Sequence, residues 1–129
     1  MSEHDVLTLI KQADKAISAE DFDALMKFYA DDAALVVQPG HIAKGKAQIR
    51  EAFIAIAEHF KNTLTVTQGT AHVIEGADTA LVIMETHLHV AETAAPMTRR
   101  ATYVFHRDQT HGWLCTVDNS YGTDLLYAD

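Results

Sequence analysis

Apolar residues in the first half of the chain recur at the spacing of amphipathic helices. Residues 6–17 carry an apolar side chain at every third or fourth position, which predicts a first helix with one buried stripe. Residues 21–29 predict a short second helix that ends in an aromatic pair. The β-prone run 33–37 then predicts a strand followed by a loop, and residues 46–61 predict a third, longer helix.

The second half of the chain predicts strands, because apolar and polar residues alternate over several long runs. Four strands are predicted, over residues 64–75, 79–91, 97–107 and 112–121. Turns at residues 75–78 and 108–111 join the first and last pairs, and residues 94–96 predict a loop between the pairs. Helices followed by antiparallel strands indicate an α+β fold, and 129 residues fit one domain spanning residues 1–129.

The two faces of the strand predicted over residues 79–91 differ in polarity. One face carries Val82, Met84 and Thr86 and is otherwise apolar, so we expect it to face the helices and a pocket. The opposite face mixes apolar and polar side chains, which suits pairing with another subunit. This expected dimer face consists of Leu81, Ile83, Glu85, His87 and His89.

The last predicted strand leaves two orientations open for a carboxylate. Regular alternation puts Val117, Asn119 and Tyr121 on one face and Asp118 on the other. A β-bulge, which is common in curved strands, exchanges the two faces. Whether Asp118 or Asn119 faces the pocket therefore depends on the regularity of this strand.

Composition and charge exclude several classes of protein. The 18 acidic residues outnumber the 10 basic ones, and the net charge of −8 argues against a nucleic-acid partner. No apolar run approaches the ~18 residues that cross a bilayer. The polar start is unlike a secretory signal, so we expect a cytoplasmic protein with no membrane partner. The single cysteine, Cys115, excludes an internal disulfide and a cysteine-rich zinc site.

Three segments carry a resemblance to a known family: FYADDAALVVQPG at residues 28–40, KGKAQIREAF at 44–53 and HGWLCTVDNSYG at 111–122. With them, the chain resembles the NTF2-like superfamily in its SnoaL-like and ketosteroid-isomerase-like branch. The resemblance implies a cystatin-like α+β cone, in which three N-terminal helices pack on a strongly curved, mainly antiparallel sheet around an internal pocket. It also implies a homodimer formed through the outer side of the sheet.

The resemblance, combined with the strand faces, implies a pocket for a small hydrophobic or aromatic ligand and no cofactor. A mainly apolar lining with few polar groups is the usual composition of a small-molecule site. The expected lining is Tyr29, Val37, Phe53, Phe60, Val82, Met84, Thr86, Val117, Asn119 and Tyr121.

The positions that carry isomerase chemistry in the ketosteroid-isomerase relatives hold different residues here. The family's base matches Gln38, or Val37 if the register slips, and neither side chain accepts a proton. The family's oxyanion tyrosine and protonated aspartate match Ala13 and Tyr103. We therefore do not expect steroid isomerisation, although Tyr103 is able to donate a hydrogen bond to a ligand oxygen.

The candidate catalytic residues are Tyr103, Asp118 and His72. Asp118 is a candidate general base, and with Arg100 it is the nearest match to the Asp–Arg–Asp set of the limonene-epoxide-hydrolase branch. His72 lies in a β-prone run and is the candidate acid–base group for cyclisation of the SnoaL type. The alternatives are an exposed or dimer-edge carboxylate for Asp118 and a half-exposed strand histidine for His72.

The chain contains eight histidines, a residue type that commonly binds metal ions, so a metal site is a candidate. The sharpest group is Glu85, His87 and His89 on one strand face, with His106 on the next strand as a possible further ligand. Neighbours at i and i+2 lie roughly 6.5–7 Å apart along a strand, so three in a straight row rarely bind one ion. We expect no metal site and interpret the group as the polar half of the dimer face.

Three classes of function follow from these patterns. The first is binding of a small hydrophobic molecule, with or without acid–base catalysis of the cyclase, hydrolase or isomerase type in the pocket. The second is a non-catalytic module for dimerisation or ligand sensing. The third, which is favoured least, is a metal-dependent enzyme that uses Glu85, His87 and His89. A cone filled by Trp113, Tyr121 and Phe53 would favour the second class, because no cavity would remain.

Overall fold

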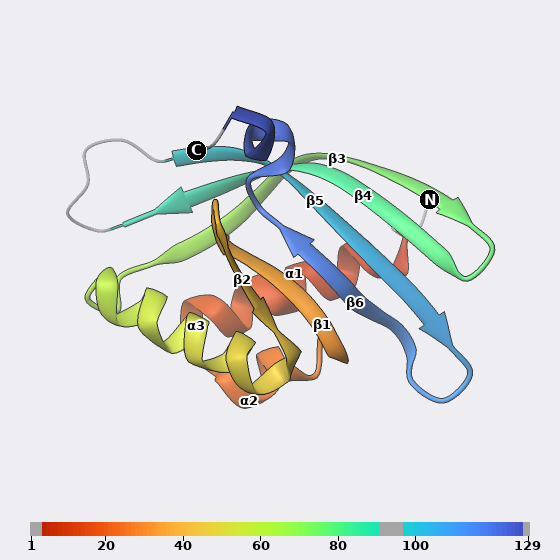
Figure 1. Cartoon of the computed structure of the whole chain (residues 1–129), viewed down its shortest axis with the longest axis horizontal. Coiled ribbons are helices and arrows are strands. Elements are labelled where there is room, and N and C mark those ends of the chain that lie inside the picture. The colour runs from red at the N-terminus through yellow and green to blue at the C-terminus, as the bar shows by residue number, and fades with distance from the viewer. Residues whose placement is uncertain (1–3, 91–96, 128–129) are drawn as a thin grey trace.

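The computed structural model describes residues 4–90 and 97–127 and confirms the α+β fold (Figure 1). Its helices are α1 (Asp5–Ala19), α2 (Phe22–Met26), α3 (Gly45–His59) and a 3-10 helix, η1 (Gly122–Tyr127). Its strands are β1 (Tyr29–Gln38), β2 (His41–Lys44), β3 (Thr65–Gly76), β4 (Thr79–His89), β5 (Met97–Asp108) and β6 (Gly112–Asn119). The loop predicted at residues 94–96 lies outside the described residues.

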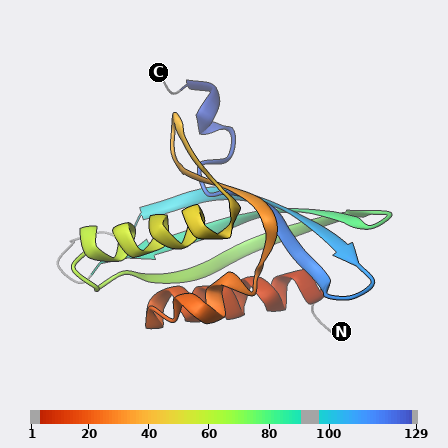
Figure 2. The ribbon, with the colours of Figure 1, turned by 60° about the horizontal axis from the view of Figure 1, so that its bottom comes forward.

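The six strands form one sheet in the order β2-β1-β6-β5-β4-β3. Only β1 and β6 pair in parallel, and the other neighbours are antiparallel. The sheet curls, with α1 packed against β3 and α3 packed against β1 and β2 (Figure 2). No helix within the described residues is long and apolar enough to cross a membrane.

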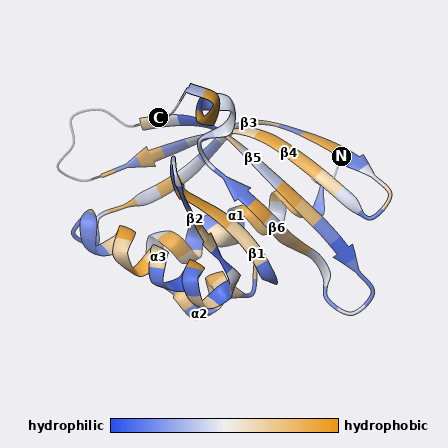
Figure 3. Ribbon diagram, in the orientation of Figure 1, coloured by the Kyte–Doolittle hydropathy of each residue, from blue (hydrophilic) through white to orange (hydrophobic). Residues whose placement is uncertain are grey.

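The helices bury the stripes that their sequences predict. In α1 the stripe includes Val6 and Ile10, both fully buried, and the helix starts where Nδ1 of His4 accepts a 3.2 Å hydrogen bond from the Val6 N–H. In α3, Ile49 and Phe53 are buried. Apolar and polar residues alternate along α3 (Figure 3), because only one side of the helix faces the sheet.

Three local predictions were wrong. The pair Phe28–Tyr29 does not end the second helix, because Tyr29 already belongs to β1, and the Phe28 C=O accepts a 2.9 Å hydrogen bond from the Cys115 N–H of β6. The loop after residue 40 contains a short strand, β2, which pairs with β1 across a turn at Gly40 (φ +83°). The helix η1 was not predicted, so the helical segments number four within the described residues rather than three.

A β-bulge in β6 decides the orientation of the carboxylate. Val104 pairs with Val117 while the next residue of β5, Phe105, pairs with Cys115, so Thr116 is the extra residue. The Thr116 hydroxyl donates a 3.1 Å hydrogen bond to the Val104 C=O. After Thr116 the alternation of inward and outward residues is reversed, so Asp118 points inward and lines the cavity.

The regular alternation expected for β6 is therefore wrong. Val117 and Asn119, which we expected to line the pocket, lie on the outer face beyond the bulge, and Val117 is 38% exposed. Asn119 instead organises the turn into η1. Its Oδ1 accepts hydrogen bonds from the N–H groups of Tyr121 and Gly122 at 3.1 and 3.2 Å.

Candidate active site

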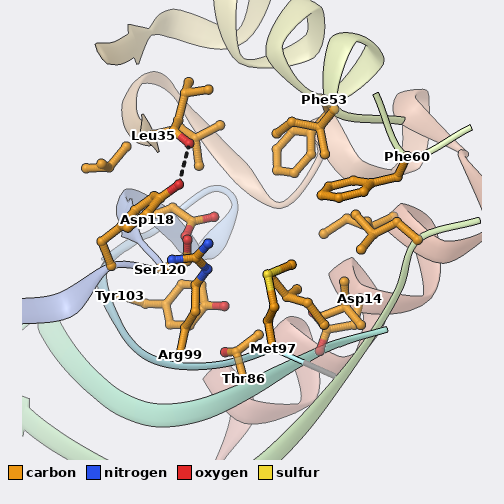
Figure 4. Close-up of a pocket in the computed structure, with 18 residues that line it drawn as sticks. Asp14, Leu35, Phe53, Phe60, Thr86, Met97, Arg99, Tyr103, Asp118 and Ser120 are labelled. Carbon is orange, nitrogen blue, oxygen red and sulfur yellow. Dashed lines mark hydrogen bonds between the residues drawn. The ribbon is translucent and has the colours of Figure 1, made fainter. Parts of the chain in front are cut away.

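A cavity of about 180 Å³ lies between α1, α3 and the inner face of the curled sheet (Figure 4). Its lining is mainly apolar and comes from both helices, from the strands other than β2, and from the segments that follow α3 and β6. The lining residues are Asp14, Ile17, Leu35, Val36, Val37, Phe53, Ile56, Phe60, Leu64, Val66, Thr86, Leu88, Met97, Arg99, Tyr103, Asp118, Ser120 and Tyr121. The cone is therefore hollow and not filled by its own aromatic side chains.

Two aromatic side chains of the lining lie opposite two of its hydrogen-bonding groups. In Figure 4, Phe53 and Phe60 face Asp118 and Tyr103 across the cavity. Phe53 is buried, and its ring lies 6.3 Å from that of Tyr29. A ligand in this space would meet the aromatic carbons of Phe53 and Phe60 across from the oxygens of Asp118 and Tyr103.

Asp118 is a buried carboxylate held by a tyrosine. The Tyr29 hydroxyl, itself fully buried, donates a 2.6 Å hydrogen bond to Oδ2 of Asp118. Burial raises the pKa of Asp118 from 3.8 to about 6, and the bond from Tyr29 opposes that rise. Near neutral pH, Asp118 is therefore mostly ionised while its pKa is close enough to neutrality for it to accept a proton.

Asp14 is a second carboxylate in the same cavity, contributed by α1. Its Oδ2 accepts a 2.8 Å hydrogen bond from Nε2 of Gln68, and Oε1 of Gln68 accepts a 2.9 Å bond from the Thr86 hydroxyl. Burial raises the pKa of Asp14 to about 7, with Gln68 opposing the rise and the negative charge of Asp118 adding to it. Asp14 is therefore about half protonated at neutral pH.

Gln68 reaches Asp14 because β3 also contains an irregularity. The pairing of β3 with β4 shifts register between Gln68 and Ala71, so residues 69 and 70 lie opposite the single residue Glu85 and β3 has one extra residue. Gln68 pairs with Thr86, and both side chains turn toward α1. Asp14 also borders an open groove on the outside of the molecule, between α1 and β3, together with Lys11 and Lys15. Asp14 is thus part of the wall between the internal cavity and this groove.

Tyr103 supplies a neutral hydroxyl beside the two carboxylates. Its side chain is 7% exposed. Burial raises the pKa of Tyr103 well above its ordinary value of 10, and the negative charges of Asp118 and Asp14 raise it further. The phenol therefore keeps its proton and is able to donate a hydrogen bond to an oxygen in the cavity.

The site thus combines two carboxyl groups of different pKa with a neutral hydroxyl donor. Pairs of titratable groups whose surroundings separate their pKa values commonly divide the roles of acid and base. Here the hydrogen bond from Tyr29 favours the ionised form of Asp118, which suits the base, and the negative charge of Asp118 raises the pKa of Asp14, which suits the acid. The arrangement can remove a proton from a bound molecule and deliver another to it.

The structure places the expected pocket residues in three positions. Val37, Phe53, Phe60, Thr86 and Tyr121 line the cavity. Tyr29, Val82 and Met84 are buried in the core, where Tyr29 acts behind Asp118. Val117 and Asn119 are the corrections already described, caused by the bulge in β6.

Two of the three candidate catalytic residues lie in the cavity, and the third lies outside it. Tyr103 and Asp118 lie together in the cavity. His72 does not, because it is an exposed residue of β3 that borders a shallow groove on the outer face with Ile83 and Arg100. This placement removes His72 from the acid–base candidates and Arg100 from the proposed Asp–Arg–Asp set.

The histidine-rich strand face lies on the outside of the sheet. Ile83, Glu85 and His89 are exposed there, and Leu81 and His87 are half-buried. Nδ1 of His87 lies 3.1 Å from the Thr98 hydroxyl. His106 pairs with Thr79, six residues along β4 from Glu85, so it is not a shared ligand. No group of three potential metal ligands is close enough to bind an ion within residues 4–90 and 97–127.

Sequence reasoning missed Asp14, Arg99 and Ser120 of the cavity lining, and Gln68, which donates a hydrogen bond to Asp14. The strongest unused signal was Asp14, which lies between Ile10 and Ile17 in the apolar stripe of the first helix, where a carboxylate is unexpected. Arg99 shares the inward face of β5 with Ala101 and Tyr103, so regular alternation already predicted that its side chain points inward. Gln68 carried no such signal because the irregularity of β3 turns it inward.

Comparison with protein families identifies the chain. The model of a family described as a SnoaL-like domain matches residues 6–115. The chain belongs to the SnoaL-like domain family. Most of the cavity lies in the matched residues, and Asp118, Ser120 and Tyr121 follow them. No curated protein matches the sequence significantly.

Solved structures share the fold of this SnoaL-like protein at low sequence identity. An NTF2-like protein of unknown function from Pseudomonas putida has a TM-score of 0.78 and 19% identity, covering 90% of this chain and 82% of its own. A candidate ketosteroid isomerase from Shewanella frigidimarina has a TM-score of 0.73 and 13% identity, covering 88% and 91%. A candidate dehydratase of the NTF2-like family from Streptomyces avermitilis has a TM-score of 0.68 and 20% identity, covering 88% and 91%. At these identities the similarity concerns the fold alone.

Proposed function

We propose that this SnoaL-like protein is an acid–base enzyme that moves a proton on a small, mainly apolar carbonyl compound bound in the cavity. The observation that carries the proposal is the pair of buried carboxyl groups, Asp14 and Asp118, at one mainly apolar cavity. Buried polar groups reduce stability unless they are compensated. Titratable groups with strongly shifted pKa values in a cavity are therefore candidates for function.

In the proposed reaction, the carboxylate of Asp118 removes a proton from the carbon next to the substrate carbonyl. The hydrogen bond from Tyr29 orients the Asp118 carboxylate and favours its ionised form near neutral pH. The Tyr103 hydroxyl donates a hydrogen bond to the oxygen on which negative charge develops. The protonated Asp14 then delivers a proton to the substrate, either at a second carbon or at a departing hydroxyl group.

The proposal differs from steroid isomerisation in the position of the base. Gln38, which matches the family base, is exposed at the end of β1 and is an amide. Asp118 of β6 takes that role instead. The names of two structural neighbours, a candidate ketosteroid isomerase and a candidate dehydratase, are in keeping with proton transfer at carbon, although only their fold is shared.

The proposal is tested by exchange of substrate hydrogen with solvent, which detects proton removal before the product is known. A panel of small ketones and hydroxyketones is incubated with the protein in D₂O, and loss of the C–H signals next to the carbonyl is followed by NMR. We expect exchange with the wild-type protein and with His72→Gln, whose side chain is outside the cavity. We expect Asp118→Asn to lose it by at least roughly 100-fold.

Exchange that is equally fast in wild-type protein and Asp118→Asn would exclude Asp118 as the base. A panel that binds without any exchange would favour the alternative, a non-catalytic module that senses a small ligand. A thermal-shift measurement on the same compounds separates these outcomes, since a ligand stabilises the folded state to which it binds.

We also propose that the protein forms a homodimer through the outer face of β3, β4 and β5. This face exposes two large apolar side chains, Ile74 at 50% and Ile83 at 43%. Charged and histidine side chains accompany them, including Glu85 and His89. A mixed face of this kind is typical of subunit contacts.

A further inference from the structure

The cavity contains both acidic and basic side chains. Its two carboxylates, Asp14 and Asp118, are each 8% exposed. Arg99 is half-buried and lines the cavity together with Met97, which is 36% exposed. Arg99 is the one Lys or Arg among the described residues that line the cavity.

The guanidinium of Arg99 is held in place by an aromatic ring. Its Cζ lies 4.2 Å from the centre of the Tyr121 ring, a cation–π contact. The Tyr121 ring is held in turn, since its hydroxyl donates a 3.2 Å hydrogen bond to the Val37 C=O (Figure 4). A stacked guanidinium keeps the N–H donors along its edge available for a planar, two-oxygen acceptor.

Arg99 has no carboxylate partner among residues 4–90 and 97–127. The ion pairs formed by these residues do not include it, and Asp14 and Asp118 belong to none of them. A guanidinium at contact distance would keep those carboxylates ionised, whereas their pKa values are raised. Arg99 is thus a half-buried cation whose charge is not matched by a described neighbour.

Strand pairing gives Arg99 and Arg100 opposite directions. Arg99 pairs with Thr86, and both residues line the cavity. Arg100 pairs with Glu85 and borders the groove on the outer face. The two adjacent arginines therefore differ in location and not in chemistry.

We infer that the cavity binds a small carboxylic acid with an apolar body, whose carboxylate is held by Arg99 through paired N–H donors. The ligand carboxylate lies at Arg99, which forms no ion pair with Asp14 or Asp118, and the apolar carbons contact Phe53 and Phe60. The inference rests on the proposed function, because the bound acid is the compound on which Asp118 acts. It narrows the substrate to a keto or hydroxy acid.

Binding of two matched probes tests the inference without turnover. The probes are 3-phenylpropanoate and 3-phenylpropanamide, which share their shape and differ in charge. Affinities are measured by calorimetry on the wild-type protein and on Asp118→Asn, which cannot remove the proton. We expect the acid to bind roughly tenfold more tightly than the amide in both proteins.

Variants of Arg99 and Arg100 test which arginine causes the preference for the acid over the amide. Arg99→Gln should remove the preference for the acid, Arg99→Lys should keep part of it, and Arg100→Gln should leave it unchanged. Melting temperatures of the variants show whether the fold is retained. Equal affinity for acid and amide in the wild-type protein would overturn the inference, as would a preference that persists in Arg99→Gln. A preference for the acid without any hydrogen exchange would support the inference and sink the proposed reaction.

Discussion

The hydroxyl of Tyr29 donates a 2.6 Å hydrogen bond to the carboxylate of Asp118, across 89 residues of sequence. Tyr29 begins β1 and Asp118 lies near the end of β6, and the parallel pairing of these strands brings them together. A hydrogen bond to a carboxylate favours its ionised form. The bond therefore counteracts the effect of burial and keeps the pKa of Asp118 at about 6.

Tyr29→Phe is expected to raise the pKa of Asp118 further, because only burial then acts on the carboxyl group. The acidic limb of the activity profile should move to higher pH by about one unit. Carbon-13 NMR of the aspartate side chains between pH 4 and 9 measures the change directly. Tyr121→Phe is the matched control, since its hydroxyl bonds the Val37 C=O instead. An unchanged Asp118 titration in Tyr29→Phe would contradict this account.

The stability of the protein should fall as the pH rises from about 4 to 7. The folded pKa values of Asp14 and Asp118, about 7 and 6, lie above the ordinary value of 3.8. In this range the folded state holds more protons than the unfolded state, so deprotonation favours unfolding. Their stabilising effect is complete below pH 4 and is lost as the pH passes through the folded pKa values.

Asp14→Asn should remove much of this pH dependence. Each pKa unit corresponds to about 1.4 kcal/mol, so the variant should gain on the order of 3 kcal/mol relative to wild type between pH 4 and 8. Urea unfolding of both proteins at these two pH values gives the difference. The double variant Asp14→Asn, Asp118→Asn should show the flattest profile. If the free energy of unfolding changed equally between pH 4 and pH 8 in wild type and in Asp14→Asn, the raised pKa of Asp14 would be refuted.

The proposed reaction should have a bell-shaped pH profile with its maximum between about pH 6 and 7. Asp118 must be ionised to act as the base and Asp14 protonated to act as the acid, and their pKa values are about 6 and 7. Because the two groups interact, the limbs report on the pair. Asp14→Asn should lose the basic limb while it retains exchange of the substrate C–H. A basic limb that persists in this variant would exclude Asp14 as the acid.

Gly122→Ala should destabilise the turn that carries Tyr121 to the cavity. Gly122 has a φ of +55°, and a Cβ there would collide with the carbonyl oxygen of Arg100. Gly40→Ala is the control, because Gly40 also has a positive φ of +83° but no atom lies within 4 Å of the added Cβ. We expect a loss of roughly 1 kcal/mol for Gly40→Ala and a clearly larger loss for Gly122→Ala. Equal melting temperatures for Gly122→Ala and Gly40→Ala would show that the turn at Gly122 accommodates the added Cβ without a further loss of stability.

Ile83→Glu should weaken the proposed homodimer by about tenfold or more, since a charge would be buried in the contact. Light scattering across a concentration series measures the association. Ile42→Glu is a suitable control, because Ile42 is 51% exposed but belongs to β2 at the far edge of the sheet. A monomeric wild-type protein at micromolar concentration would disprove the dimer.

Periodicity predicted the fold and the faces of the regular strands. The long helices follow from apolar residues at helical spacing, and the buried residues Val82, Met84 and Thr86 of β4 follow from alternation. Both signals repeat over many residues, so a single exception does not hide them. The strand β2 has only four residues, two of them lysine and histidine, and offered no such repetition.

The polar part of the site was harder to predict, because it depends on exceptions to periodicity. Asp118 faces inward only because Thr116 is an extra residue, and Gln68 faces inward beside a second irregularity. Neither event leaves a mark in the order of apolar and polar residues. Asp14 was visible as an acid in an apolar stripe, but a lone exception could not be distinguished from a partly exposed helix position.

The bulge in β6 makes the chemistry of the cavity depend on how the strand pairs as well as on the identity of its residues. If Thr116 paired with Val104 and the strand were regular, Val117 and Asn119 would face inward and Asp118 outward. An amide would then replace the acid on the inner face without any change of sequence. The unpaired position of Thr116 is thus the difference between a site that can exchange protons and one that can only form hydrogen bonds.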